Sequence, residues 1–326
     1  MVDLVTGAAG FIGQHVVAAL AAEGRAVRGL DLLAKPPGLA CDWVQGSILD
    51  PRAMAEACQG VARVFHLAAI PHFWTPERNA HQQVNVAGTE AVIAAARAAG
   101  VAKLLHCSTE AILMPLSKAL GREVDEHHAP PASAMPGPYT RSKLAAEAAA
   151  LAASDLAPVV VNPTAPIGPG DQAMTPPTRM LTDFLAGRYP AFLDCTLNLV
   201  DVRDVAAGHL LAAEKGAPGQ RYILGGENIQ LSRLLALLGE ISGQEMPKRA
   251  IPGWVALTSA KVATWWANSV SKQAPSATPE GVRLALSAGP LSSARAEQDL
   301  GYQPRPLREA LEAALTDLRE RDLAPR

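Results

Sequence analysis

The sequence predicts an α/β protein built on a doubly wound parallel sheet of about seven strands. Short β-branched or apolar runs alternate with longer helical stretches through the first two hundred residues, and a glycine-rich turn joins the first run to the first helix. This alternation is typical of βαβ crossover units, which form parallel sheets covered on both faces. The chain has 326 residues, 49% of them hydrophobic, which is enough for a sizeable core.

The expected strands are short and apolar, at residues 2–6, 26–31, 42–45, 62–67, 101–107 and 157–162. The expected helices between them cover residues 11–23, 51–59, 78–99 and 138–154. The segment that begins NPTAPIGPGD after residue 161 is too rich in proline and glycine for regular elements. A helix at 202–215 and a strand at 221–226 are expected to return to the main sheet. The pattern therefore predicts a main domain at 1–165, rejoined by 202–226, and a discontinuous, mostly helical substrate lobe at 166–201 and 227–326.

Charge and cysteine content exclude several classes of protein. Lys and Arg (29) nearly balance Asp and Glu (31), so the net charge of -2 gives no electrostatic footprint for nucleic acid or an acidic membrane. The four cysteines, Cys41, Cys58, Cys107 and Cys195, have no CxxC spacing, which favours reduced thiols in a cytoplasmic protein. The first strand begins at residue 2 and leaves no room for a signal peptide.

The stretch TGAAGFIG places Gly7, Gly10 and Gly13 between a strand and a helix. Glycines in this position permit a tight turn and let backbone N–H groups approach a pyrophosphate, which the helix N-terminus also attracts. The motif predicts a Rossmann-like dinucleotide-binding domain at 1–165. Asp31 at the end of the second strand suits the two ribose hydroxyls of NAD and repels a 2'-phosphate. Arg28 and Lys35 leave NADP open as the less favoured cofactor.

Tyr139 and Lys143 lie four residues apart in an alanine-rich helix, so they share one helical face. A lysine ammonium, acting together with a positive nicotinamide ring, would lower the pKa of the phenol and make it an acid/base group for a hydroxyl or carbonyl. Thr109 follows the fifth strand, where a doubly wound sheet opens its ligand crevice. The three side chains are therefore the predicted catalytic group.

These segments resemble the extended short-chain dehydrogenase/reductases, which include epimerase-like and dihydroflavonol reductase-like enzymes. The matching stretches are TGAAGFIG, FHLAA, NVAGT, HCST, YTRSK, VVNPT and NLVDVRDVAAGH, in the family's order. Within the family, the stretch from NPTAPIGPGD to YILGGEN is similar to the hopanoid-associated sugar epimerase subgroup. The resemblance implies a homodimer formed through helices beside the active-site helix.

The resemblance also assigns individual positions. Tyr139 would be the acid/base, Lys143 would bind the nicotinamide ribose, and Thr109 would orient the substrate oxygen. The further cofactor contacts that it implies are Phe11 and Ile12 in the glycine turn, Leu67, Ala68 and Ala69 after the fourth strand, Asn85, and Pro163. Ile48 would take part in adenine recognition, because Gly46 and Ser47 precede it where many relatives have an acidic residue.

The sequence therefore predicts an NAD-dependent enzyme that transfers hydride between nicotinamide and a secondary alcohol or ketone. The subgroup resemblance implies a sugar-like or polyol group, small or linked to a lipid such as a hopanoid, and net oxidoreduction and epimerisation both remain open. One alternative is a carbonyl reductase or alcohol dehydrogenase for a small cyclic or aromatic ketone; another is a non-catalytic NAD sensor. His72, Glu110 and Arg203 are the candidate substrate contacts.

Two further segments have competing interpretations. Residues 251–270 contain Trp254, Trp265 and Trp266 but also Lys261, so a membrane-spanning helix is disfavoured. A core-facing helix with its tryptophans packed inside is favoured over peripheral membrane contact or a pocket for a greasy substrate. No metal site is expected, because the ligand spacing around His106, His127 and His128 is irregular.

Overall fold

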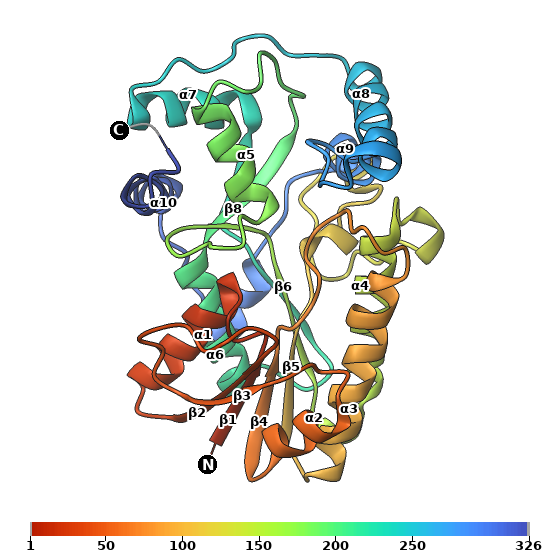
Figure 1. Ribbon diagram of the computed structural model, residues 1–326, viewed down its shortest axis with the longest axis vertical. Helices are drawn as coiled ribbons and strands as arrows, with labels where there is room; N and C mark the ends of the chain where they lie inside the picture. Colours follow the sequence, from red (N-terminus) through yellow and green to blue (C-terminus); the bar gives the residue numbers. More distant parts are fainter. Residues whose placement is uncertain (1, 325–326) are drawn as a thin grey trace.

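The computed structural model describes residues 2–324 and confirms the predicted α/β fold (Figure 1). Its main sheet has seven strands in the order β3-β2-β1-β4-β5-β6-β9, and every pairing in it is parallel. The strands are β1 (Val2–Thr6), β2 (Ala26–Asp31), β3 (Asp42–Gln45), β4 (Val61–His66), β5 (Lys103–Cys107), β6 (Val159–Pro163) and β9 (Arg221–Leu224). Each lies within two residues of its predicted bounds.

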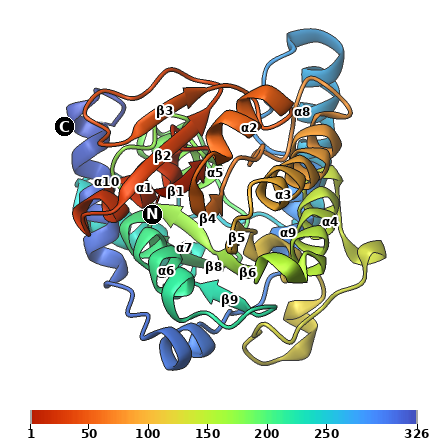
Figure 2. The ribbon, with the colours of Figure 1, turned by 90° about the horizontal axis from the view of Figure 1, so that it is seen from below.

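Helices cover both faces of this sheet (Figure 2). On one face lie α1 (Phe11–Ala22) and α6 (Val202–Lys215); on the other lie α2 (Pro51–Cys58), α3 (Gly88–Ala98) and α4 (Pro138–Ala152). The predicted helix at 78–99 is confirmed to within two residues: it begins at residue 80, passes through a π-helical turn at Gln82–Ala87 and continues as α3. Each layer buries its own apolar cluster, one centred on Val5, Phe65 and Leu105, the other on Leu4, Val64 and Leu104. Alternate residues of one strand thus fill opposite layers.

A second, three-stranded sheet lies beyond the carboxyl ends of the main strands (Figure 1). Its order is β10-β8-β7, with β7 (Ala165–Ile167), β8 (Thr196–Asp201) and β10 (Glu227–Gln230). The expectation of no regular element in the proline- and glycine-rich stretch that begins NPTAPIGPGD was therefore wrong at β7. Pro166 is compatible with this strand because β7 pairs with β8 alone and lies at the sheet edge.

The remaining labelled helices lie at the same end of the molecule as the small sheet (Figure 1). They are α5 (Pro176–Leu185), α7 (Leu231–Ser242), α8 (Gly253–Trp266), α9 (Pro279–Ser287) and α10 (Leu307–Glu320). Leu181, Leu234 and Leu311 from α5, α7 and α10 share one apolar cluster with Leu199 of β8. The helix α8 departs from the sequence interpretation: Trp254, Trp265 and Trp266 are 73%, 62% and 53% exposed, so they are not packed inside.

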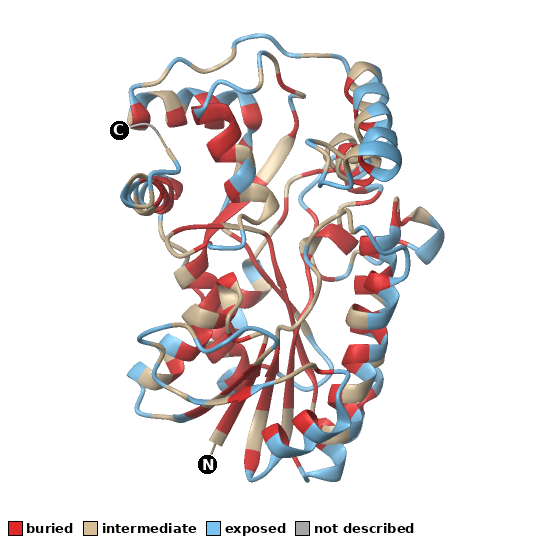
Figure 3. Ribbon diagram, in the orientation of Figure 1, coloured by how far each residue is buried: buried red, intermediate tan, exposed pale blue. Residues whose placement is uncertain are grey.

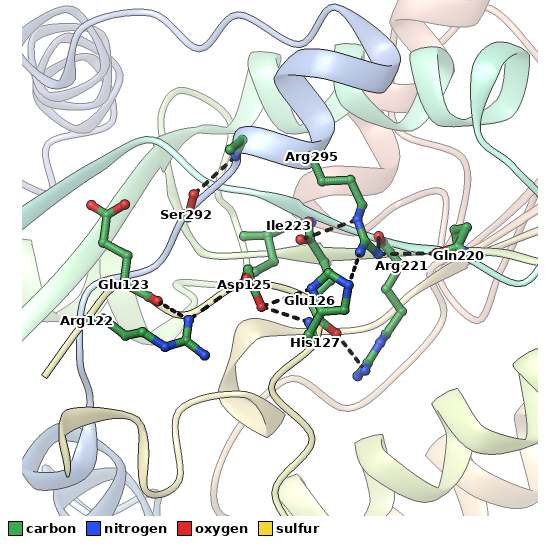
Figure 4. Close-up of polar contacts among 11 residues, drawn as sticks. Arg122, Glu123, Asp125, Glu126, His127, Gln220, Arg221, Ile223, Ser292 and Arg295 are labelled. Carbon is green, nitrogen blue, oxygen red and sulfur yellow. Dashed lines mark hydrogen bonds and ion pairs between the residues drawn. The ribbon is translucent and has the colours of Figure 1, made fainter. Parts of the chain in front are cut away.

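The free edge of β9 is covered by the segment that precedes α4 (Figure 4). The Ile223 N–H donates to Oε1 of Glu126 at 2.7 Å, and Nη2 of Arg221 donates to the Glu126 carbonyl at 2.8 Å. Arg295 lies 3.8 Å from the Glu126 carboxylate and donates to Nε2 of His127 at 3.0 Å. These contacts satisfy an exposed strand edge, which would otherwise pair with another chain.

Candidate active site

The turn between β1 and α1 leaves no room for side chains. Gly7 has a φ of +72°, and a Cβ there would lie 2.7 Å from the Ala68 nitrogen. A Cβ at Gly13 would lie 2.0 Å from the Gly7 carbonyl oxygen. Among the described residues no side chain caps α1, whose N-cap is Gly10. The backbone N–H groups at the start of α1 therefore have no side-chain acceptor within residues 2–324, and such groups at a helix N-terminus are suited to binding a pyrophosphate.

Asp31 lies beside this turn at the end of β2. Its Oδ2 accepts a hydrogen bond from the Ala9 N–H at 3.0 Å, and its Oδ1 accepts one from the Leu33 N–H at 3.1 Å. The two cations that left NADP open are engaged elsewhere. Arg28 donates to the Ala57 and Gln59 carbonyls at the end of α2, at 3.0 and 2.8 Å, and Lys35 donates to the Cys41 carbonyl at 2.7 Å. Of the three charged residues Arg28, Asp31 and Lys35, it is thus Asp31 that contacts the glycine turn.

The structure brings the three predicted catalytic residues together. Tyr139 and Lys143 extend from α4 and are 7% and 4% exposed. The Lys143 ammonium donates to the Cys107 carbonyl at the end of β5, at 2.7 Å. Thr109, 8% exposed, is within hydrogen-bonding reach of the Tyr139 phenol and donates to Oε2 of Glu110 at 3.0 Å. Glu110 therefore joins the same cluster.

The pKa values in this cluster follow from burial. Burial raises the pKa of Tyr139 above its ordinary value, although the Thr109 hydrogen bond opposes this rise. Burial lowers the pKa of Lys143 and raises that of Glu110 to about 7. The expectation of a lowered phenol pKa is thus not met by the protein alone, because the loss of hydration outweighs the hydrogen bond with Thr109, and the Glu110 carboxylate raises the pKa of the phenol further.

Two aromatic rings from the segment after β4 lie next to the Tyr139 ring. The Phe73 ring meets the Tyr139 ring edge-on at a centroid distance of 5.2 Å, and the His81 ring lies at 6.1 Å. Nε2 of His81 donates to the His72 carbonyl at 2.8 Å, which ties the loop to the start of the next helix. Burial lowers the pKa of His72, and Arg179 of α5 lowers it further. The Tyr139 ring is therefore bordered by a partly apolar wall.

Glu280, a residue not identified from the sequence, holds the first turn of α4. It is 4% exposed and lies in α9, where its carboxylate accepts from the Thr140 N–H at 2.8 Å, the Thr140 hydroxyl at 2.7 Å and the Tyr139 N–H at 3.3 Å. A side chain at Gly137 would be 2.0 Å from this carboxylate. In the sequence, Glu280 resembles an ordinary first-turn acid of its own helix. Nothing local to residue 280 indicates a partner at residue 140.

Most of the remaining predicted cofactor residues lie at the carboxyl ends of main-sheet strands or at the start of α1. The Leu67 N–H donates to the Thr6 carbonyl at 3.1 Å and the Ala68 N–H to the Thr6 hydroxyl at 3.3 Å, so Leu67, Ala68 and Ala69 lie across from Gly7. Pro163 ends β6 opposite Leu224. Phe11 and Ile12 form the start of α1.

Asn85 and Ile48 are buried. Asn85, 1% exposed, accepts from the Ile70 N–H at 2.8 Å and donates to the Ser142 hydroxyl at 3.0 Å, which joins the loop after β4 to α4. Ile48, 5% exposed, packs in the core beside Gly88. Both side chains act through packing or hydrogen bonds within the protein.

Other sequence candidates lie apart from the cluster. Arg203 donates to both carboxylate oxygens of Asp201, at 2.9 and 2.6 Å, so its guanidinium is engaged within α6. His127 contacts Arg295 (Figure 4), and Nε2 of His128 lies 3.0 Å from the Pro115 carbonyl, to which it donates. Within residues 2–324, no three His, Cys, Asp or Glu side chains are arranged to hold a metal ion. No helix of this range is long and apolar enough to cross a bilayer.

Comparisons with known proteins agree with this site. The model of the NAD dependent epimerase/dehydratase family matches residues 4–225, a span that contains the glycine turn, Asp31, Thr109, Tyr139 and Lys143. A Synechocystis protein named "Putative dihydroflavonol 4-reductase" is 36% identical over 95% of this chain and 92% of its own. "Sterol demethylase protein B" of Methylococcus capsulatus is 32% identical over 99% and 100%. The crystal structure of gox2253 matches with a TM-score of 0.87 and 35% identity over 99% of both chains.

Proposed function

Because this chain belongs to the NAD-dependent epimerase/dehydratase family, and so to the extended short-chain dehydrogenase/reductases, we propose that its cluster of Thr109, Tyr139 and Lys143 acts on a secondary alcohol or ketone. The chain is an NAD(P)-dependent oxidoreductase or epimerase of this family. The observation that supports the proposal best is the convergence of these three side chains at the carboxyl end of β5.

In the proposed reaction Tyr139 transfers the proton of the substrate oxygen, while Thr109 donates a hydrogen bond to that oxygen. Lys143 holds a positive charge next to the cofactor ribose and favours the phenolate. When bound, the nicotinamide ring exchanges a hydride with the substrate carbon and adds a positive charge in its oxidised form. This added charge is what we expect to offset the burial that raises the pKa of Tyr139.

The geometry supports NAD as the cofactor. The glycine turn packs so closely against the protein backbone that a Cβ at Gly7 or Gly13 would not fit, and no described side chain caps the N-terminus of α1. Asp31 presents a carboxylate where the adenosine ribose is expected, and Arg28 and Lys35 are bonded to backbone carbonyls instead of facing a 2'-phosphate. We propose that the backbone at Phe11 and Ile12 meets the pyrophosphate.

The substrate is proposed to be a lipid or a sugar-like group on a lipid, held by the lobe formed by residues 166–201 and 227–326. The apolar wall of Phe73 beside Tyr139 favours a hydrophobic body next to the reacting oxygen. One relative is named a sterol demethylase protein, which supports a polycyclic lipid such as a hopanoid. The alternative is the reduction of a small cyclic or aromatic ketone. It is supported by the same apolar Phe73 ring and by the relative named a putative dihydroflavonol 4-reductase.

Turnover assays with both cofactors and both substrate classes separate these candidates. Net NADH consumption in proportion to product indicates a reductase, whereas product formation from a catalytic amount of cofactor, with no net change in absorbance, indicates an epimerase. Activity on soluble cyclic ketones alone would contradict the lipid proposal. The absence of any hydride exchange with either class would contradict the proposed function itself.

The homodimer and the cytoplasmic location stay predictions. Sedimentation velocity of the purified chain tests the first, because a dimer doubles the mass. Fractionation of cells that express the full chain tests the second.

A further inference from the structure

One face of α8 exposes large apolar side chains to solvent. Trp254, Val262 and Trp265 are 73%, 61% and 62% exposed, followed by Trp266 at 53% and Val270, in the π-helical turn after α8, at 52%. We call these five residues the tryptophan face. In Figure 3 the ribbon of α8 is mostly coloured as exposed or intermediate. Soluble proteins rarely leave such large apolar side chains grouped in water.

The helix α8 differs from an ordinary surface helix in which of its side chains are buried. Its buried residues are the small Ala256 and Ala260, which are 6% and 0% exposed and pack against Val282 of α9, with the partly buried Leu257 beside them. The large apolar residues point outward instead. A groove of about 840 Å³ lies along this outer side, between α8 and the segment 273–276 that returns toward α9. Packing against the rest of the chain therefore does not explain the tryptophans.

The charged residues of the segment that carries the tryptophan face have one sign. Residues 246–279 contain Lys248, Arg249, Lys261 and Lys272, all exposed, and no Asp or Glu. The chain as a whole has a net charge of -2, so this segment departs from its surroundings. Exposed tryptophans with flanking lysines are typical of proteins that bind the surface of an anionic bilayer. At this interface an indole ring can bury its apolar part and hydrogen-bond through its N–H, and lysines are attracted to the lipid phosphates.

The tryptophan face also adjoins the catalytic crevice. Nε1 of Trp74 donates to Oδ1 of Asn268, in the turn after α8, at 2.8 Å. The preceding residue, Phe73, contacts the Tyr139 ring. One short loop thus joins the exposed face to the proposed catalytic phenol.

We propose that the tryptophan face docks the protein onto the surface of an anionic lipid bilayer. In this orientation Trp254, Trp265 and Trp266 enter the headgroup region and the four cations meet lipid phosphates. A second copy of the chain is a less suitable occupant, since a twofold pairing through this face would place Lys261 and Lys272 near their own counterparts. The inference goes beyond the proposed function, because docking is expected whichever alcohol or ketone is the substrate.

Co-sedimentation of the full chain with vesicles tests the proposal. We expect binding to phosphatidylcholine vesicles that contain phosphatidylglycerol, with a blue shift of tryptophan fluorescence, and weak binding to phosphatidylcholine alone. Raising the salt concentration should weaken binding. Lys261→Gln with Lys272→Gln should reduce the partition coefficient about fivefold per charge, whereas Arg52→Gln on the distant helix α2 should leave it unchanged.

The apolar contribution is tested by the triple variant Trp254→Ser, Trp265→Ser and Trp266→Ser. We expect binding to fall by roughly a hundredfold or more, while Leu323→Ser, a change at another exposed apolar residue, should have little effect. Circular dichroism and NADH turnover on a soluble ketone verify that the variant is folded, and they separate failure of docking from failure of the proposed function.

Three results would overturn the proposal: no binding of the unaltered chain to anionic vesicles, equal binding by the folded triple variant, or a loss of dimer in the triple variant, which would assign the face to a second copy. Turnover of a soluble substrate without vesicle binding would refute docking while leaving the catalytic proposal intact.

Discussion

Replacing Glu280 with alanine should weaken both the fold and the reaction, because this carboxylate fixes the start of the helix that bears Tyr139. Two buried N–H groups, those of Tyr139 and Thr140, would lose their acceptor. The Thr140 hydroxyl retains the Gly137 carbonyl at 3.2 Å as an alternative. A buried donor without a partner costs about 1 to 3 kcal/mol, so we expect a loss of about 3 kcal/mol in the free energy of unfolding.

For a chain of this length, about 1.5 °C of melting temperature corresponds to 1 kcal/mol, so the melting temperature should fall by about 5 °C. The second readout is kcat. Tyr139 lies in the first turn of α4, and a displaced phenol should reduce kcat roughly tenfold or more, since catalysis depends on its position. Differential scanning fluorimetry and steady-state kinetics measure the two effects.

A matched control is Thr278→Ala. Thr278 caps α9 through its own hydroxyl, which accepts from the Gly281 N–H at 3.1 Å, and does not contact α4 through that hydrogen bond. It should cost about 1 kcal/mol of stability with kcat unchanged. Gly137→Ala supplies the reverse test, because its Cβ would displace the Glu280 carboxylate. In the double variant the Gly137→Ala cost should largely disappear. An unchanged kcat in folded Glu280→Ala, or strict additivity of the pair, would refute the reasoning.

Two further predictions concern the site. The folded protein raises the pKa of Glu110 to about 7 from the usual 4.5, so between these pH values it binds more protons than the unfolded chain. The free energy of unfolding should therefore fall as the pH rises from about 4.5 to 7, and Glu110→Gln should flatten this dependence in thermal melts recorded across pH. An identical slope in the variant would contradict the assignment. Asp31→Ser should raise the Kd for NADH about tenfold or more in isothermal titration and reduce the ratio by which the protein binds NADH more tightly than NADPH. Asp31→Asn is the conservative control. An unchanged ratio would show that Asp31 does not bind the ribose.

The alternation of apolar runs and helices predicted the bounds of the main-sheet strands to within two residues, because each βαβ unit is encoded by a continuous stretch of chain. The turn at Gly7 and Gly13 could be predicted for the same reason. The short strand β7 could not, since its pairing with β8 depends on residues more than thirty positions away and Pro166 argues locally against a strand.

Residues that act through distant partners also escaped prediction from the sequence. Glu280 reaches Thr140 across 140 positions, and Arg203 is engaged by Asp201, whose role as a helix cap is not evident from sequence spacing alone. The orientation of α8 was predicted wrongly because aromatic content favours burial on average, whereas the small residues Ala256 and Ala260 determine which side packs.

The central claim is that Tyr139 transfers the proton during hydride exchange. Its most direct test compares Tyr139→Phe with Tyr302→Phe, a change at a buried tyrosine outside the proposed site, by measuring single-turnover hydride exchange at saturating NADH together with the Kd for NADH. We predict that Tyr139→Phe slows exchange by roughly a hundred- to ten-thousandfold with little change in the Kd, and that Tyr302→Phe exchanges hydride normally. Exchange at the unaltered rate in Tyr139→Phe would contradict the account.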